Sequence, residues 1–166
     1  MGARKRQLVG YADADWANDL DDRKSVSGGT LFWGNSVIMW FSRKQHMVCT
    51  STAEAEIHAI LEMVHTIGKA AAILGELLLN VFGETVGRLP FILNDNQPGL
   101  DAIKSRKGRT KHYDIKVKFI AEGIERGDFA VHKVSSWENI ADAFTKPLRS
   151  VRFRALTGTF MANRIG

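Results

Sequence analysis

The sequence predicts an α/β domain in which a mixed five-stranded sheet is flanked by helices. Three antiparallel-type strands come first, and strands alternate with helices afterwards. The composition, 45% hydrophobic and 25% charged over 166 residues, is that of one globular domain with a real core. Cys49 is the only cysteine, so no internal disulfide framework exists. The net charge of +5 favours a polyanionic partner.

Short apolar runs bounded by turn residues predict the five strands at residues 8–13, 28–33, 37–41, 89–95 and 129–134. The first three are antiparallel, because a Gly34-Asn35 turn joins the second and third strands as a hairpin. The first and fourth strands each end on an acid. The strand ends are therefore candidate positions for a site.

Helical periodicity predicts helices at residues 52–79, 96–103, 114–126 and 135–145. We expect a break near Gly68 in the first helix. The last helix begins at a capping-box spacing, Ser135 to Glu138, and Pro147 stops it. No basic-then-apolar leader opens the chain and no apolar run is long enough for a bilayer, so we expect neither secretion nor a membrane partner.

The chain divides into three parts by pattern. Residues 1–7 are an N-terminal extension or an expression start, residues 8–148 form the domain, and residues 149–166 are a basic tail. The tail is poorly patterned, and we expect it to be partly mobile.

The start of the first long helix carries two carboxylates with different surroundings. Ser51 and Glu54 have the spacing of a capping box, which accounts for Glu54. At about 100° per residue, the apolar residues Ala59, Ile60, Met63 and Ile67 fall within roughly 60° of Glu56, whereas Glu54 points about 160° away. Glu56 thus faces the protein interior, where a carboxylate needs a cation or hydrogen bonds. A buried ion pair and a metal site both satisfy that need.

Three further acids share the kind of position in which α/β sheets build sites. Asp13 and Asp95 end strands, and Asp142 lies early in a helix after a strand. Together with Glu56 they offer hard oxygen donors, which suit Mg²⁺ or Mn²⁺. Crowded carboxylates beside a polyanionic partner suit two-metal hydrolysis of a phosphodiester. Each acid alone has an ordinary explanation, as a turn residue or a helix-dipole partner.

Six motifs in order carry a resemblance to a known family. Residues 10–17 (GYADADWA), 22–28 (DRKSVSG), 51–56 (STAEAE), 95–97 (DNQ), 109–115 (RTKHYDI) and 140–148 (IADAFTKPL) resemble the ribonuclease H domain of copia-type (Pseudoviridae) LTR retrotransposon polyproteins. The resemblance extends from about residue 9 to residue 148. It implies the ribonuclease H-like fold.

The resemblance also implies a function. The family's acids fall on Asp13, Glu56, Asp95 and Asp142, with Asp15 as a fallback for Asp13. They imply an endonuclease that uses two Mg²⁺ ions, or Mn²⁺ as a substitute, to cut the RNA strand of RNA–DNA hybrids and leave 5′-phosphates. The implied setting is reverse transcription behind an upstream reverse transcriptase domain of the same polyprotein. That setting is intracellular, in a virus-like particle of the cytoplasm or nucleus, and the oligomeric state stays open.

Substrate contacts are expected on the basic loop 104–112 and near the acids. The candidates that bind nucleic acid are Ser51, Thr52, Asn96, Arg106, Lys107, Arg109, Lys111 and His112. Many cellular ribonucleases H carry a histidine on the loop before the last helix, and this chain departs from that pattern. His112 and His132 are the possible substitutes. Trp16, Trp33, Trp40 and Trp137 are expected in the core or against the sheet.

Two alternatives to an active ribonuclease H remain. One is a catalytically weak or inactive binding module that keeps the fold, which would predict a missing acid. The other is a nuclease of the same superfold that cuts DNA, such as a transposase or resolvase, whose last acid is placed differently. The complete set of four acids favours the ribonuclease H.

Overall fold

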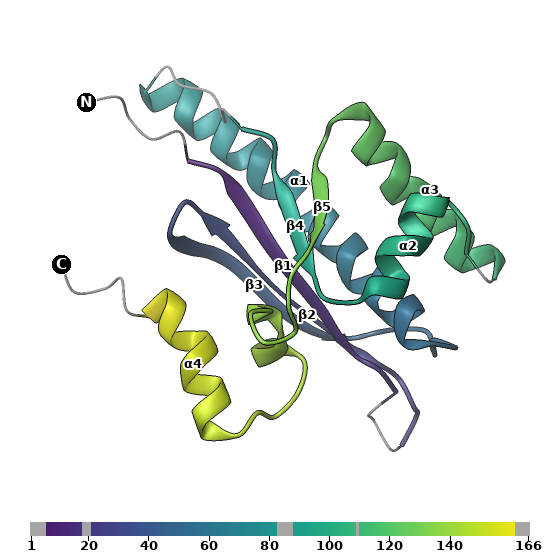
Figure 1. Ribbon diagram of the computed structural model, residues 1–166. Helices are drawn as coiled ribbons and strands as arrows, with labels where there is room; N and C mark the ends of the chain where they lie inside the picture. Colours follow the sequence, from purple (N-terminus) through teal and green to yellow (C-terminus); the bar gives the residue numbers. More distant parts are fainter. Residues whose placement is uncertain (1–5, 18–20, 83–87, 109, 162–166) are drawn as a thin grey trace.

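The structure is a computed structural model that describes residues 6–17, 21–82, 88–108 and 110–161. Its centre is a five-stranded sheet in the order β3-β2-β1-β4-β5 (Figure 1). The strands are β1 (Leu8–Asp15), β2 (Val26–Trp33), β3 (Ser36–Lys44), β4 (Phe91–Asn94) and β5 (Ala130–Lys133). β1, β2 and β3 are antiparallel, whereas β4 is parallel to both β1 and β5. The predicted mixed sheet and the hairpin at Gly34-Asn35 are thus confirmed.

The helical elements are α1 (Thr52–Phe82), α2 (Gln97–Ser105), α3 (Lys111–Arg126), the 3₁₀ helix η1 (Ile140–Phe144) and α4 (Ser150–Met161). α1 runs without interruption, so the expected break near Gly68 is wrong. A glycine inside a helix costs only about 1 kcal/mol relative to alanine. The packing of α1 along the sheet outweighs that cost.

α1 lies across one face of the sheet, and α3 packs on α1. Ala59, Ile60 and Met63 are fully buried there, as the helical face predicted. Two strand glycines let the helix approach closely: a Cβ on Gly10 would lie 2.6 Å from the Met63 sulfur, and one on Gly29 would lie 2.7 Å from the Met63 methyl carbon. This contact fixes the height of α1 over β1, and with it the height of Glu56.

By length and mean hydropathy, the stretch Thr52–Val81 of α1 also passes the test for a helix that could cross a membrane. The core helix of a globular protein passes the same test. The buried stripe of α1 packs on the sheet in this chain, so the test carries little weight.

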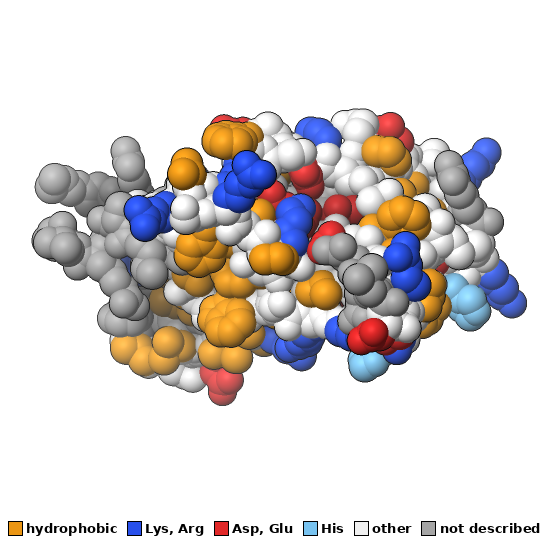
Figure 2. Space-filling model, turned by 90° about the horizontal axis from the view of Figure 1, so that it is seen from below, with side chains coloured by type: hydrophobic (Ala, Val, Ile, Leu, Met, Phe, Trp, Pro, Cys, Tyr) orange, Lys and Arg blue, Asp and Glu red, His pale blue; other side chains and the backbone are white. Residues whose placement is uncertain are grey.

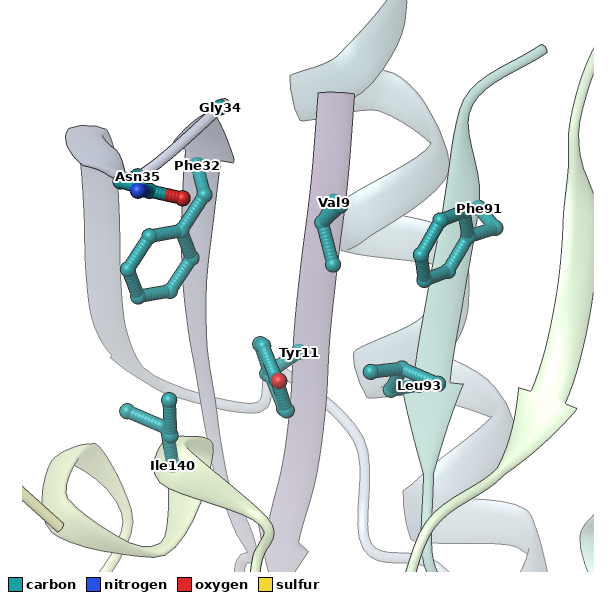
Figure 3. A pocket seen from close by; sticks show the side chains of 8 residues that line it. All are labelled: Val9, Tyr11, Phe32, Gly34, Asn35, Phe91, Leu93 and Ile140. Atoms are coloured by element: carbon teal, nitrogen blue, oxygen red, sulfur yellow. The ribbon is translucent and has the colours of Figure 1, made fainter. Parts of the chain in front are cut away.

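Among the described residues, only part of the other face of the sheet is covered. It carries an apolar pocket of about 360 Å³ lined by Val9, Tyr11, Phe32, Gly34, Asn35, Phe91, Leu93 and Ile140 (Figure 3). Ile140 belongs to η1, which packs against β1 and β2. η1 therefore lies on the face toward which Asp13 points, since Asp13 alternates in phase with Val9 and Tyr11 along β1.

Two expectations for the C-terminal part are corrected. The helix predicted over residues 135–145 is the shorter η1, because the Asn139 side chain caps it by accepting a hydrogen bond from the Ala141 N–H at 3.2 Å. The Ser135–Glu138 pair instead forms a local hydroxyl–carboxylate bond of 2.6 Å. The tail, in which the sequence pattern indicated no helix or strand, contains α4 with Leu156 buried.

Candidate metal centre

Asp13 and Asp95 come together because two parallel strands stop pairing. The β1–β4 ladder ends at Tyr11 and Leu93, and each acid lies two residues beyond its paired residue. Side chains two residues apart in a strand share a face, so Asp13 continues the Tyr11 side of β1. The gap between the diverging strands gives the carboxylates room.

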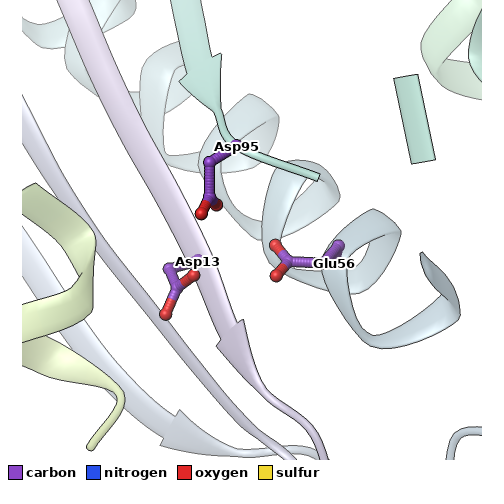
Figure 4. Close-up of side chains that lie close together, drawn as sticks. All are labelled: Asp13, Glu56 and Asp95. Carbon is purple, nitrogen blue, oxygen red and sulfur yellow. The ribbon is translucent and has the colours of Figure 1, made fainter. Parts of the chain in front are cut away.

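Glu56 enters the same gap from the second turn of α1. One ligand oxygen from each of Asp13, Glu56 and Asp95 lies within 4.8 Å of the others (Figure 4). The exposed fraction is 3% for Asp13 and 5% for Glu56. Glu56 therefore reaches the other acids, as the helical face predicted. Glu54 is also only 5% exposed, but its carboxylate turns back to the Thr50 N–H and hydroxyl. We call Asp13, Glu56 and Asp95 the three-acid group.

Two buried asparagines orient this group, and the sequence analysis did not single out either as an orienting residue. The Asn94 amide donates to Glu56 Oε2 at 2.8 Å and to the Ala12 carbonyl at 3.0 Å. The Asn139 amide donates to Asp95 Oδ1 at 3.0 Å and to the same carbonyl at 3.1 Å. Because β1–β4 pairing ends at Tyr11, the Ala12 carbonyl needs side-chain donors in place of a strand.

Burial, together with the neighbouring carboxylates, raises the pKa values of Asp13 and Glu56. Burial raises the pKa of Glu56 to about 9, with Asp13 and Asp95 adding to the rise and the Asn94 amide opposing it. Burial also raises the pKa of Asp13 to about 6; Lys146 and the Thr145 hydroxyl oppose this, while Asp142 and Asp95 add to it. A cation among these oxygens would reverse both shifts.

Asp142, the fourth predicted acid, is buried beside the three-acid group and is paired with cations. Its Oδ1 lies 2.7 Å from the Lys146 ammonium, and its Oδ2 lies 3.0 Å from a guanidinium nitrogen of Arg152. Lys146 also lies 3.8 Å from Asp13 Oδ2, and the Thr145 hydroxyl donates to that oxygen at 2.5 Å. Burial works against the charge of Lys146, but Asp13 and Asp142 raise its pKa.

The donor set fits divalent cations that prefer oxygen ligands. The three-acid group offers converging carboxylates and contains no cysteine or histidine ligand. The raised pKa values of Asp13 and Glu56 show that their charged forms, buried without an adjacent metal ion, are incompletely compensated by the neutral amides and by Lys146. Asp15, the fallback for Asp13, ends β1 outside this group.

Figure 2 shows the surface from below, where acidic side chains gather near the middle and Lys and Arg side chains lie around them. Among the predicted substrate contacts, Lys107, Lys111 and His112 are exposed, and Arg106 pairs with Glu125. Arg109 lies outside the described residues. Basic side chains thus reach the surface on the α2–α3 side of the site.

The other predicted contacts have local structural partners. Ser51 Oγ accepts from the Glu54 N–H at 3.2 Å, and Glu54 accepts from the Thr50 N–H at 2.8 Å, so the predicted cap is confirmed. Thr52 begins α1 and is exposed. Asn96 caps α2 by accepting from the Gly99 N–H at 2.7 Å.

Three of the four tryptophans are not in the core. Trp16, Trp40 and Trp137 are 42%, 66% and 68% exposed. Trp40 stacks on Phe144 of η1, and the Arg152 guanidinium lies 4.3 Å from the centre of the Trp137 ring. Of the two candidate histidines, His132 packs edge-on against Phe91, and His112 is exposed at the start of α3.

Solved structures with this fold are ribonucleases H. An RNase H1 from the archaeon Halobacterium salinarum matches 84% of this chain and 94% of its own with a TM-score of 0.59 at 12% identity. LC11-RNase H1 in complex with an RNA/DNA hybrid matches 84% of this chain and 94% of its own with a TM-score of 0.58 at 13% identity. The protein therefore has the ribonuclease H fold.

The sequence relatives are transposon polyproteins, and a scan of protein-family models gives no match. The chain is 32% identical over 95% of its length to the Pol polyprotein of transposon RE1 of Arabidopsis thaliana, and 30% identical over 93% to the Ty1-JR1 Gag-Pol polyprotein of Saccharomyces cerevisiae. It spans 11% and 9% of these two polyproteins. The resemblance carried by the motifs is confirmed: the chain has the ribonuclease H fold and is similar over nearly its whole length to Pol polyproteins of copia- and Ty1-type transposons.

Proposed function

We propose that this chain is an endonuclease that hydrolyses the RNA strand of RNA–DNA hybrids and leaves 5′-phosphate products. The observation that carries the proposal is the three-acid group, buried at the end of the β1–β4 ladder with its oxygens within 4.8 Å. The ribonuclease H fold and the transposon relatives support the same assignment.

Asp13, Glu56, Asp95 and Asp142 would hold divalent cations, Mg²⁺ or Mn²⁺. Two such ions, when bound, supply an activated water on one side of the scissile phosphate and charge neutralisation at the leaving oxygen. The chain's own side chains prepare that chemistry. Asn94 and Asn139 keep the Glu56 and Asp95 carboxylates turned toward the gap.

The basic side chains around the acids would hold the hybrid by its phosphates. Lys107, Lys111 and His112 on the α2–α3 side are exposed to do so. Selection of the RNA strand would come from 2′-hydroxyl contacts and the A-like shape of the hybrid. Ser51, Thr52 and Asn96 lie close to Glu56 and Asp95 in the chain and are the candidates for such contacts.

The setting we propose is reverse transcription within a virus-like particle, with an upstream reverse transcriptase domain of the same polyprotein as partner. The chain spans 11% and 9% of the length of two transposon polyproteins, as one domain of such a polyprotein would. The alternative is a binding module without useful catalysis. The presence of all four acids argues against it.

The deciding experiment incubates the protein with a labelled RNA–DNA hybrid, an RNA duplex and a DNA duplex, each with Mg²⁺, Mn²⁺ or chelator. We expect metal-dependent cutting of the RNA strand of the hybrid alone. Binding of the hybrid without cutting would favour the binding module. Cutting of the DNA duplex would favour a different nuclease of this superfold.

A further inference from the structure

α4 reaches the candidate metal centre through one side chain. Arg152 lies in the first turn of α4, and its guanidinium donates to Asp142 Oδ2 at 3.0 Å. The same guanidinium donates to the carbonyls of Ser136 and Trp137 and covers the Trp137 ring. Only 16% of the Arg152 side chain is exposed. Arg152 thus joins three parts of the chain: α4, the loop before η1, and η1 itself.

These contacts distinguish the two oxygens of Asp142. Oδ2 is taken by Arg152, whose planar fork is also fixed by two carbonyls and an aromatic face. Oδ1 is on the side of Lys146, whose ammonium also lies 3.8 Å from Asp13. A carboxylate held at one oxygen presents the other in a defined direction, and here that oxygen faces the Lys146 ammonium, which also lies near Asp13.

We propose that Arg152 is a positioning residue that aims Asp142 Oδ1 at the metal centre, so that α4 is part of the working domain. This inference rests on the proposed function, because it assigns Asp142 to the ion-binding set. Metal ligands are commonly oriented by outer partners of this kind, and removing such a partner typically costs about 10- to 100-fold in metal affinity or activity.

A purely structural role for Arg152 makes a different prediction. If Arg152 only fastened α4 to the loop before η1, its loss would lower thermal stability and leave ion affinity unchanged. If it positions Asp142, ion affinity must fall, and the fall must disappear when Asp142 can no longer act as a ligand. The two roles separate in a double-mutant cycle.

The test measures Ca²⁺ binding by calorimetry, the Mg²⁺ concentration for half-maximal hybrid cleavage, and KM for the hybrid. The variants are Arg152→Met, Arg152→Lys and Arg154→Met. We expect Arg152→Met to weaken Ca²⁺ binding about 10-fold and to raise the Mg²⁺ requirement equally, with KM unchanged. Arg152→Lys should recover part of the loss, because it keeps the charge and one donor. Arg154, an exposed arginine of the same helix, supplies the matched control and should behave as wild type.

The cycle adds Asp142→Asn and the double variant Asp142→Asn/Arg152→Met. We expect Arg152→Met to have no further effect on Ca²⁺ affinity in the Asp142→Asn background. Two results would overturn the proposal. One is an Arg152→Met variant that binds Ca²⁺ as tightly as wild type; the other is a double variant that binds Ca²⁺ about 10-fold more weakly than Asp142→Asn alone. If Arg152→Met fails to fold, Arg152→Lys and Trp137→Leu decide the question by the same two readouts.

Failure of the proposed nuclease function can be distinguished from failure of the positioning role of Arg152. A wild-type protein that binds Ca²⁺ but leaves the hybrid uncut would contradict the nuclease assignment, and the calorimetric series would still decide the role of Arg152. A wild-type protein that binds no divalent ion would overturn the positioning role with it.

Discussion

The two sides of the candidate centre handle negative charge in opposite ways. In the three-acid group the carboxylates crowd together, and neutral amides from Asn94 and Asn139 hold them. On the other side, Asp142 is paired with Lys146 and Arg152. The first arrangement leaves negative charge that a divalent cation can neutralise, whereas the second is already balanced. We therefore expect ion affinity to come chiefly from the three-acid group.

The strongest test of this comparison is Asp95→Asn, which removes one charge from the crowded side at nearly constant shape. Loss of a partner that orients a metal ligand typically lowers activity by about 10- to 100-fold. We expect Asp95→Asn to lower hybrid cleavage by more than that, because Asp95 would itself be a ligand. Thermal stability in chelator should not fall, because repulsion with Asp13 and Glu56 is relieved. Initial cleavage rates and unfolding curves measure both effects. Retained cleavage by Asp95→Asn would contradict the assigned site.

The pH dependence of stability tests the crowding directly. The pKa of Glu56 is about 9 in the folded protein against 4.5 ordinarily, so the folded state binds more protons between these values. The free energy of unfolding of the metal-free protein should therefore fall as pH rises through this range. Urea unfolding at several pH values, in chelator, measures it. Glu56→Gln should flatten the profile, and Mg²⁺ should restore stability most at high pH.

Asn94→Ser sharpens the comparison by removing the amide that orients Glu56. We expect ion affinity to fall about 10-fold. The free energy of unfolding should also fall by about 1–3 kcal/mol, because a buried acceptor loses its donor. Calorimetry with Ca²⁺ and urea unfolding measure the two effects. Asn35→Ser, at the exposed hairpin turn, is the control and should change neither.

Lys146→Met removes a cation from the balanced side. We expect Ca²⁺ to bind several-fold more tightly, because the ammonium near Asp13 and Asp142 no longer repels the incoming ion. Calorimetry compares the variant with wild type. Weaker binding would mean that Lys146 supports the ion site, and the contrast between the two sides would need revision.

The smallest effect is expected from Glu54→Gln, two residues from Glu56 but engaged in the helix cap. Its loss should cost about 1 kcal/mol of stability and leave hybrid cleavage near wild type. Thermal unfolding and a cleavage assay check this. If Glu54→Gln abolished hybrid cleavage while Glu56→Gln retained it, the assignment of the two glutamates would be reversed.

Local patterns predicted the elements whose signal lies within a few residues. The alternating strands, the Gly34-Asn35 hairpin and the inward face of α1 follow from periods of two and 3.6 residues. Glu56 was found in this way before any contact was known. α4 escaped prediction because it lacks an apolar stripe: Val151 and Phe153 are exposed and Leu156 is buried. Its place is fixed by the polar contacts of Arg152, which leave no periodic trace.

The sequence by itself determined the order of the five strands and of the helical elements before residue 148, and it indicated four acids as candidates for the site, because hydrophobic period and motif order are properties of the chain. Only the tertiary structure decided which acids meet and what holds them. Asn94 and Asn139 converge on the Ala12 carbonyl from residues 82 and 127 positions away, and Arg152 reaches Asp142 from a separate helix. Such contacts depend on where the β1–β4 ladder ends in space, and no local pattern records that point.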